Sequence, residues 1–558
     1  MVRHSLFTNS EVEREREILQ SRGRKVIWLT PDNQEIEAQI PPTTYPPRKD
    51  TSMLAEAIFS LGEGRGRKML EIGCGSGVIG TWANQRNWRC SACDINPYSV
   101  AATRALFSNY GFPPEMVREG GPGEGANSAW AGDENYDLIV WNLPYMSPPQ
   151  NATELLGPLE ESALLDLEKD GTDSLLLNSL QTIEPNSASI SHTKTQHPTA
   201  ADALNISASA QTQQTSFKGS RLLAKGGLIL LVHSSNENGR RISGKWAKKG
   251  WASKIIHSTS FADGEELFVL ALWRAFSEAR VERVDSIDST NRYLLEKGGR
   301  LGSRICAIQQ TEGRGMSNNK WDTRDGSFAC SWVLHDGMQT QFKPGQAQLL
   351  AGLATLKAIN FLTDDTGGTK KEGIFKGIEI FQKWPNDIWS KRGKVAGILI
   401  EGRSDGSKQT IVLGIGVNLC EIVSGTSSAN SKQNIAHEQK YPHDSLQNIF
   451  TKSVSRKELE RTLNATLASY FENPPLQILP TEKENIIPQT DISFIAEKAQ
   501  IFSNITHYLH HHSKPMINGV VVKPTDINSD GELVVTHKGE SISIDSPSQL
   551  TWPHKSQP

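Results

Sequence analysis

Residues of the N-terminal half combine types and spacings that suit them to bind a small cofactor. A glycine-rich loop runs from Glu71 through Gly73 and Gly75 to Gly77, directly after a short apolar segment at residues 68–73. Glycine tolerates the backbone angles of a sharp strand-to-helix turn and lets the main chain approach a ligand closely. By itself such a loop is equally compatible with a plain turn between a strand and a helix.

Two further features narrow the ligand. Asp94 follows the loop by about 20 residues and ends another apolar segment, where a carboxylate can bind ribose hydroxyls. The sequence Asn-Leu-Pro-Tyr at residues 142–145 follows a third apolar segment at residues 136–141. The glycine spacing GxGxG, rather than GxGxxG, favours S-adenosylmethionine over a dinucleotide.

Together these segments resemble class I S-adenosylmethionine-dependent methyltransferases, in particular the Asn-Pro-Pro-Tyr subgroup that methylates planar nitrogens. The sequences YPPRKDT at residues 45–51 and LEKDGTDS at residues 167–174 narrow the resemblance to release-factor glutamine methyltransferases and their archaeal-type relatives. The resemblance covers roughly residues 25–275. It implies cofactor contacts by Thr51, Glu71, Gly73, Gly75, Gly77, Asp94 and Asn142, and methyl-acceptor contacts by Asn142, Leu143, Pro144 and Tyr145.

The chemistry of an amide accounts for the Asn-Leu-Pro-Tyr sequence. An amide nitrogen is a poor nucleophile because its lone pair is delocalised, so catalysis would consist mainly of positioning. Asn142 and the carbonyl of residue 143 would accept the two N–H hydrogens, and Tyr145 would pack on the planar group; we expect Asn142 and Tyr145 to be the catalytic residues. Leu143 replaces the family's first proline and loses its fixed φ, so a retained fold with little activity is the alternative.

Five segments of the C-terminal half are suited to activating a carboxylate. They occur in the order DSTN (288–291), QQTEGRGMSNNKW (309–321), KWPND (383–387), KVAGILIE (394–401) and GIGVN (414–418). Each alone has an ordinary explanation, such as a flexible loop or a turn. In this order they resemble biotin protein ligases, over roughly residues 282–420, and the tail resembles that family's small C-terminal barrel.

This second resemblance implies that ATP and biotin form biotinyl-5′-AMP and that a lysine of a biotin carboxyl carrier protein accepts the biotin. Lys383 and Arg314 are the expected catalytic residues, because cations reduce the repulsion between the reacting carboxylate and phosphate; Mg²⁺ would shield the phosphates. Met316 replaces an arginine of the family's loop, which puts adenylate retention in doubt. The expected biotin and adenylate contacts are Ser289, Thr290, Asn291, Gln310, Arg314, Gly315, Met316, Trp321, Lys383, Asn386, Asp387 and Gly397.

The elements that must position these residues follow from hydrophobic periodicity. In the N-terminal half, strands alternate with a helix that begins at a proline, which favours a parallel sheet wrapped by helices. In the C-terminal half, strands come in adjacent groups, which favours an α+β sheet. We expect strands at 68–73, 136–141, 227–232, 305–309, 328–334, 395–401 and 411–417, helices at 97–110 and 346–361, and tail turns at 528–531 and 538–539.

A chain of 558 residues indicates several domains. We expect a multidomain protein with a Rossmann-like α/β methyltransferase domain, an α+β biotin ligase domain and a small SH3-like β-barrel. The predicted boundaries are 1–275 for the methyltransferase domain with a disordered insert at about 181–220, 276–472 for the ligase catalytic domain, 473–515 for a polar linker and 516–558 for the barrel. Another polar insert is expected at 421–445, and a histidine cluster at 507–512 is read as solvated linker rather than a metal site.

Composition limits the partners. A net charge of −3 provides no global field for nucleic acid, and no apolar run approaches the roughly 18–20 residues of a membrane span. Six cysteines exclude a disulfide scaffold and include one CxxC, Cys90 to Cys93, without a second pair for zinc. We expect a soluble cytoplasmic enzyme that acts on a carrier protein and on a release factor, without operator DNA or membrane as a partner. Two alternatives for the N-terminal half stay open: a DNA adenine methyltransferase and a non-catalytic, cofactor-binding docking module.

Overall fold

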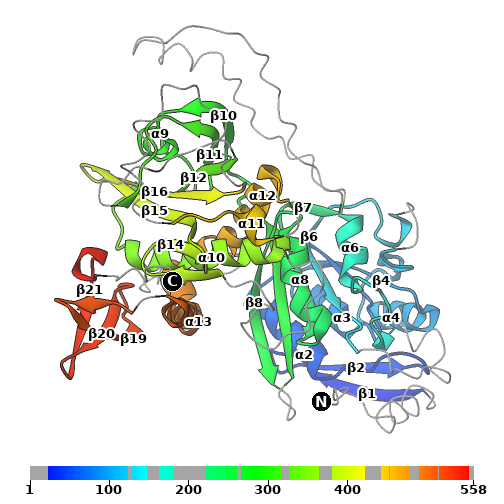
Figure 1. The fold of residues 1–558 in the computed structure, drawn as a ribbon. Helices are drawn as coiled ribbons and strands as arrows, with labels where there is room; N and C mark the ends of the chain where they lie inside the picture. Colours follow the sequence, from blue (N-terminus) through cyan, green and yellow to red (C-terminus); the bar gives the residue numbers. More distant parts are fainter. Residues whose placement is uncertain are drawn as a thin grey trace.

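The computed structural model contains two seven-stranded sheets in the order of the chain, followed by two small antiparallel sheets (Figure 1). The structure describes residues 23–123, 128–146, 163–180, 222–260, 265–316, 321, 326–363, 380–420, 442–450, 453–476, 489–512 and 514–551. The expected insert at 181–220 and most of the one at 421–445 lie outside these residues. No helix in the described ranges is long and apolar enough to cross a membrane.

The N-terminal sheet has the strand order β5-β4-β3-β6-β7-β9-β8. The first five strands run parallel, and β9 is antiparallel to both of its neighbours. These strands are β3 (Lys68–Ile72), β4 (Arg89–Asp94), β5 (Val117–Glu119), β6 (Tyr136–Asn142), β7 (Leu223–Ser234), β8 (Trp251–Ser260) and β9 (Glu266–Arg274). The strand order reverses between β3 and β6, so the carboxyl ends of these two strands are where an open α/β sheet binds its ligand.

Helices cover this sheet, and a hairpin packs on two of these helices. The helices are α2 (Lys49–Ser60), α3 (Val78–Gln85), α4 (Pro97–Asn109), α6 (Asp173–Ser179) and α8 (Glu237–Ala247), and the hairpin pairs β1 (Arg24–Leu29) with β2 (Glu35–Ile40). Helix α4 starts as expected at a proline, and the Asn96 side chain accepts the N–H of Tyr98 at its N-terminus. The parallel sheet wrapped by helices that the periodicity predicted is therefore confirmed.

The C-terminal sheet has the order β10-β11-β12-β16-β15-β14-β13 and is antiparallel except for the pair β10–β11. Its strands are β10 (Val281–Ile287), β11 (Arg304–Gln310), β12 (Ser327–Met338), β13 (Ile380–Lys383), β14 (Asp387–Ser390), β15 (Lys394–Asp405) and β16 (Lys408–Asn418). Helix α9 (Thr290–Lys297) contacts β11, β12, β15 and β16. The strands in adjacent groups thus form one mixed sheet, as expected.

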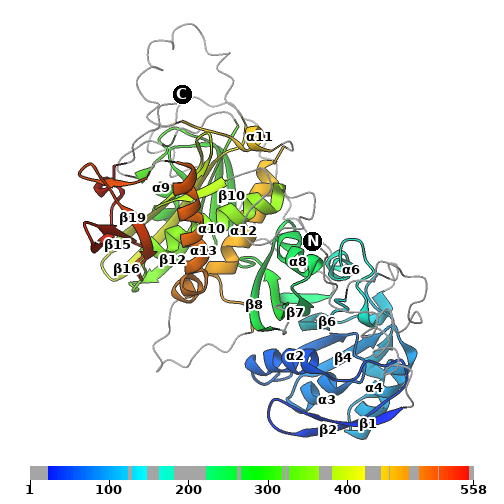
Figure 2. The same ribbon diagram turned by 60° about the horizontal axis from the view of Figure 1, so that its bottom comes forward.

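Three helices lie side by side against the C-terminal sheet (Figure 2). They are α10 (Pro344–Thr363), α12 (Arg456–Phe471) and α13 (Gln489–His511). Helix α13 corrects the prediction of a polar linker at 473–515. It packs against α10 and β13 and buries Phe494, Ile501, Ile505 and Tyr508. The polar composition around 473–488 masked an amphipathic helix, whose apolar residues recur at helical spacing.

The two halves share an interface in which α8 and β8 contact α10 and α12. The carboxylate of Glu472 accepts the indole N–H of Trp273 and the main-chain N–H of Phe276, both at 2.9 Å. Burial raises the pKa of Glu472.

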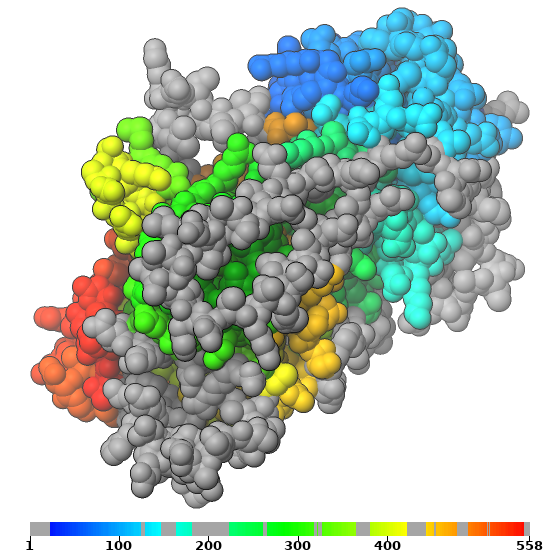
Figure 3. All heavy atoms as spheres, turned by 90° about the horizontal axis from the view of Figure 1, so that it is seen from above, coloured from blue at the N-terminus to red at the C-terminus, as the bar shows by residue number. Residues whose placement is uncertain are grey.

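The space-filling view shows the blue N-terminal half and the red C-terminal end at opposite extremes of the molecule (Figure 3).

The tail forms two small sheets that sit beside the seven-stranded C-terminal sheet. Strands β17 (Met516–Ile517) and β18 (Val520–Val521) pair with each other, and β19 (Lys523–Ile527), β20 (Leu533–His537) and β21 (Glu540–Ile544) form a meander. The meander's first turn docks on the start of α10, and the Trp384 indole donates to the carbonyl of Gly531 at 3.1 Å. The β character of the tail is confirmed, and closure into a barrel stays a prediction.

The cysteines fit no metal site among the described residues. Cys306 and Cys330 lie directly opposite each other on β11 and β12 and form a disulfide. Cys90 and Cys93 of the CxxC sequence are buried in β4. A short helix, α11 (Leu446–Ile449), completes the described elements of this half.

Candidate active sites

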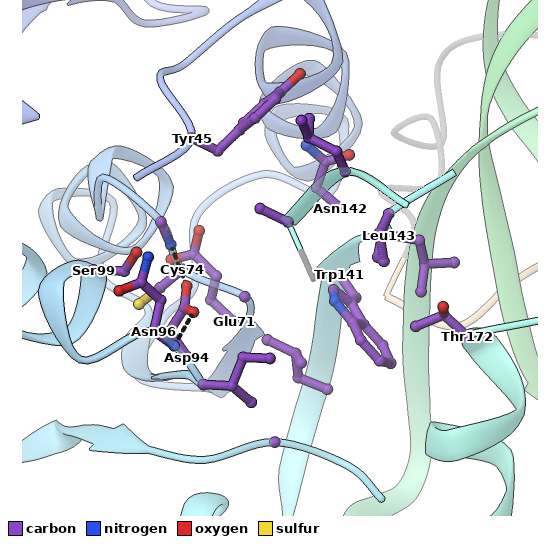
Figure 4. A pocket seen from close by; sticks show the side chains of 18 of the residues that line it. Tyr45, Glu71, Cys74, Asp94, Asn96, Ser99, Trp141, Asn142, Leu143 and Thr172 are labelled. Atoms are coloured by element: carbon purple, nitrogen blue, oxygen red, sulfur yellow. Dashed lines mark hydrogen bonds between the residues drawn. The ribbon is translucent and has the colours of Figure 1, made fainter. Parts of the chain in front are cut away.

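A cavity of about 310 Å³ opens at the carboxyl ends of β3, β4 and β6, where the strand order reverses. Figure 4 shows Asp94 and Asn96 on one side of it and Tyr45 and Asn142 on the other. The cavity brings together most of the residues that the first resemblance implied, from segments as far apart in the chain as Thr51 and Tyr145. These are Thr51, Glu71, Gly73, Gly75, Asp94, Asn142, Leu143, Pro144 and Tyr145.

The glycine loop and Asp94 form one wall. Gly73 and Gly75 have positive φ angles of 66° and 50°, which explains why glycine is needed there. The Asp94 carboxylate accepts the main-chain N–H of Gly75 and of Asn96, both at 2.9 Å. Each carboxylate oxygen keeps further acceptor capacity, which suits the pair of hydroxyls on a ribose. Burial raises the pKa of Asp94.

Glu71 lines this wall, whereas Gly77 has a different role from the cofactor contact that was expected. Gly77 does not line the cavity; a side chain there would collide with Thr103, 2.7 Å away. Glu71 is buried beneath the loop, and burial raises its pKa to about 8. The glycine loop therefore lies above the carboxyl group of Glu71, and burial favours the neutral form of this group.

The opposite wall is built around Asp50, a residue to which the sequence interpretation gave no role. Its Oδ2 accepts Tyr45 Oη at 2.9 Å, Asn142 Nδ2 at 3.0 Å and Tyr145 Oη at 3.3 Å. The side chain of Asp50 is 2% exposed. The signal was present in the sequence YPPRKDT, but the contact to Asn142 spans 92 positions and needs the tertiary fold.

The segment after Tyr145 is fastened to α8. Asn236, the residue that caps α8, donates its side-chain N–H to the carbonyl of Tyr145. The neighbouring Asp166 accepts Asn238 Nδ2 and the N–H of Thr172. These hydrogen bonds hold in place the segments around Tyr145 and Asp166, which border the cavity.

The second site lies on one face of the C-terminal sheet. Side chains alternate between the faces of a strand, and the register places Lys383 opposite Asp387, Asp387 opposite Gly397, and Gly397 opposite Gly416. Gly397, Gly414 and Gly416 form a floor without side chains. Side-chain atoms of Trp321 and Asn291 occupy the space above this floor. A Cβ atom added to Gly416 would lie 2.3 Å from Trp321, and one added to Gly414 would lie 2.4 Å from Asn291.

Helix α9 delivers the polar residues of one end of this floor. Gln310 Oε1 accepts the main-chain N–H and the hydroxyl of Thr290, both at 2.9 Å. Ser331 lies 2.7 Å from the Thr290 hydroxyl and 2.6 Å from Asn291 Oδ1. Ser289 caps α9 and is buried. The structure thus assembles Ser289, Thr290, Asn291 and Gln310 into one cluster, with Ser331 as an added member.

Charged residues occupy both ends of the floor. Glu401 accepts Asn291 Nδ2 at 2.8 Å and pairs with Arg314 at 3.0 Å. At the other end Asp387 pairs with Lys394 at 2.7 Å. Glu401 and Lys394 belong to the sequence KVAGILIE but were given no role, because only the sheet register brings them to the site.

Lys383 lies beside this second pair. Its Nζ is 4.5 Å from the ring centroid of Trp389, and burial, with a smaller effect of Lys394, lowers its pKa. Asn386 braces the adjacent turn by donating to the carbonyl of Ile398 at 3.2 Å. Met316 accepts a contact of 3.6 Å from Gln348 of α10, and Gly315 precedes it in the same loop. The segments 317–320 and 322–325 lie outside the described residues.

Comparison with known proteins divides the chain in the same way. Residues 49–198 match the methyltransferase small domain family and residues 284–418 match the biotin/lipoate A/B protein ligase family. The chain therefore carries a small methyltransferase domain and a biotin/lipoate ligase domain.

Individual relatives cover parts of the chain. A biotin–[acetyl-CoA-carboxylase] ligase of Paracoccus denitrificans is 35% identical over 24% of this chain and 51% of its own length. A ribosomal RNA small subunit methyltransferase C of Chromohalobacter salexigens is 34% identical over 17% of this chain and 27% of its own. The chain thus spans about half or less of these curated relatives. A solved biotin protein ligase of Aquifex aeolicus with biotin and ATP aligns with 49% of this chain and 98% of its own, at 22% identity and a TM-score of 0.34.

Proposed function

We propose that this chain is a bifunctional enzyme, in which the C-terminal half attaches biotin to a carrier protein and the N-terminal half methylates a planar nitrogen. The observation that supports the ligase half is the convergence of all five sequence segments on one sheet face. The observation that supports the methyltransferase half is a buried acceptor at the cavity wall, Asn142 Oδ1, for which the described residues provide no hydrogen-bond partner.

The ligase reaction proceeds in two steps. The biotin carboxylate attacks the α-phosphorus of ATP, which forms biotinyl-5′-AMP and releases pyrophosphate. A carrier lysine amine then attacks the acyl carbon, forms an amide and releases AMP. Lys383 and Arg314 stabilise the negative charge of the first step, and the neutral cluster of Thr290, Asn291 and Gln310 suits the ureido ring of biotin.

The residues that the structure describes offer little to hold a metal ion. They contain no group of three histidine, cysteine or acidic side chains placed to bind one. Two carboxylates of the ligase site, Asp387 and Glu401, already form ion pairs with the side chains of Lys394 and Arg314. We therefore assign no step to a protein-bound Mg²⁺.

In the methyltransferase half, Gly73, Gly75 and Asp94 would hold S-adenosylmethionine, whose sulfonium supplies the methyl group. Asn142 Oδ1 and the carbonyl of Leu143 would accept the two hydrogens of the nitrogen. Tyr145 would pack against the planar group. These contacts would align the nitrogen lone pair with the methyl group. The new nitrogen–carbon bond would form as the carbon–sulfur bond breaks, S-adenosylhomocysteine would be the leaving group, and the extra proton would pass to solvent.

Two acceptors fit this chemistry. The sequence YPPRKDT favours a glutamine amide of a peptide chain release factor, whereas the name of the relative from Chromohalobacter favours small-subunit ribosomal RNA, in which some bases carry an exocyclic amine. Both present an NH₂ group on a planar carbon.

Parallel assays of the purified chain test both halves. Biotin-dependent exchange of labelled pyrophosphate into ATP tests adenylate formation, and transfer of labelled biotin to a carrier domain tests the second step. Transfer of labelled methyl to release factor, to small-subunit RNA or to adenine-containing DNA separates the acceptors. Cofactor binding without transfer to any of them supports the docking module instead. Absence of pyrophosphate exchange in the presence of biotin would refute the ligase assignment.

A further inference from the structure

We propose that Asp50 is a positioning residue that fixes the orientation of the Asn142 side chain, so that its oxygen, and not its nitrogen, faces the methyl acceptor. This inference rests on the proposed methyl transfer to a planar nitrogen. It assigns a role to a residue that touches Asn142 rather than the reacting atoms.

The orientation follows from chemistry. A carboxylate accepts hydrogen bonds and donates none when ionised. Asn142 must therefore turn its NH₂ towards Asp50 Oδ2, 3.0 Å away. The carbonyl oxygen of the same amide is then directed away from Asp50, where it is buried and forms no hydrogen bond with any residue that the structure describes.

The surroundings of Asp50 hold its own carboxylate still. Oδ1 accepts the main-chain N–H of Thr51 at 2.7 Å, while Oδ2 accepts the hydroxyls of Tyr45 and Tyr145. Asp50 stands in the first turn of α2, where unpaired N–H groups favour an acidic side chain. Contacts on both oxygens leave the carboxylate little freedom to rotate, so it can serve as a fixed reference for Asn142.

A free, fixed acceptor selects the class of substrate. A flipped Asn142 would present N–H groups, which repel the N–H groups of an amide or amine and attract a carbonyl or hydroxyl oxygen. Asp50 thus makes the site specific for N–H donors and against oxygen acceptors of similar shape.

The substitution Asp50→Asn tests this role because it preserves size. An asparagine has one acceptor oxygen, which cannot serve both the Thr51 N–H and Asn142. We expect kcat/KM for the methyl acceptor that the parent uses to fall about 10- to 100-fold. The dissociation constant of S-adenosylmethionine, measured by calorimetry, should change less than about two-fold, because Asp94 and the glycine loop lie on the other wall.

A double-mutant cycle distinguishes positioning from general damage. If Asp50 acts through Asn142, then Asp50→Asn should have little further effect on kcat/KM in an Asn142→Ala background. The loss of the Thr51 contact should lower the free energy of unfolding equally in both backgrounds. An equal loss of kcat/KM in both backgrounds, or a parallel loss of cofactor affinity, would overturn the proposal.

A spectroscopic readout does not require the acceptor. In ¹⁵N-labelled full-length protein with S-adenosylhomocysteine, the side-chain NH₂ signals of Asn142 are identified by their loss in Asn142→Ala. They should shift in Asp50→Asn and stay near their place in Tyr45→Phe, which removes another donor to the same oxygen. Unchanged Asn142 signals in Asp50→Asn would overturn the proposal even if no acceptor is methylated, whereas absence of methyl transfer with the expected shifts would refute only the proposed function.

Discussion

The two sites of this chain differ in how far their groups are already committed to one another. In the methyltransferase cavity, Asp50 and Asp94 are held by main-chain and side-chain donors, and Asn142 Oδ1 has no hydrogen-bond partner within the described part of the chain. In the ligase site, Arg314 pairs with Glu401, Lys394 pairs with Asp387, and the Trp321 indole lies on the glycine floor.

This difference indicates two ways of preparing for a ligand. The cavity is preorganised, so that binding costs little rearrangement. The ligase floor is covered by its own side chains, so that substrate contacts must replace contacts within the protein. Substitutions should therefore act locally at the first site and through pairs of charges at the second.

Loss of the ligase lysine should have the largest effect. Lys383→Ala should reduce biotin-dependent pyrophosphate exchange by about 10²- to 10³-fold, because the variant lacks a cation that stabilises the reacting anions. Lys391→Ala, at an exposed lysine of the neighbouring turn, is the matched control and should exchange normally. Exchange near the parental rate in Lys383→Ala would remove this lysine from the mechanism.

The buried carboxyl beneath the glycine loop should make stability depend on pH. The pKa of Glu71 is about 8 in the folded protein, against an ordinary value of 4.5. The unfolded chain therefore releases the proton first, and stability should fall as pH rises from about 4.5 to about 8.

The variant Glu71→Gln isolates this effect. Denaturant unfolding of parent and variant at pH 5 and pH 8 should show a difference that grows in favour of the variant by about 2–4 kcal/mol. A constant difference across this range would place Glu71 in a solvated environment and contradict its burial.

Two substitutions should separate the walls of the cavity. Asn142→Ala should raise the activation free energy of methyl transfer by about 1–3 kcal/mol and leave cofactor affinity unchanged. Asp94→Ala should weaken S-adenosylmethionine binding through the lost ribose contacts. Calorimetry and labelled transfer in parallel measure both, and equal effects of the two variants on both quantities would show that the walls are not independent.

A basic residue at position 316 should slow the escape of the adenylate by a few fold. The sulfur of Met316 accepts a contact from Gln348, and a thioether donates no hydrogen bond. Met316→Arg could donate to adenylate oxygens and should lower biotinylation of bystander proteins. An unchanged release rate, measured by trapping labelled adenylate, would assign retention to another residue.

The substitution Leu143→Pro should have the smallest effect of these changes, and it should lower the stability of the protein. The N–H of Leu143 donates to the carbonyl of Val232 at 3.3 Å, and a proline has no N–H to replace it. Leu143→Pro should therefore lower the free energy of unfolding by about 0.5–1.5 kcal/mol, even if its fixed φ helps the loop. A more stable variant would show that this contact contributes nothing.

Local sequence determined much of this protein. The glycine loop, Asp94 and the Asn-Leu-Pro-Tyr sequence lie within strand-to-loop transitions that hydrophobic periodicity alone locates. The same holds for four strands of the ligase half, β11, β12, β15 and β16, and for α10, whereas β10, β13 and β14 were not predicted. These features depend on neighbours a few residues away, which a single sequence displays directly.

Only the tertiary structure decided the partners of these residues. Asp50 reaches Asn142 across 92 positions, and Glu401 reaches Asn291 across 110. Helix α13 was missed because its apolar face becomes meaningful only against α10 and β13. Hydrogen bonds and buried faces depend on which segments meet in space, and that pairing is set by sheet order and register rather than by any local pattern.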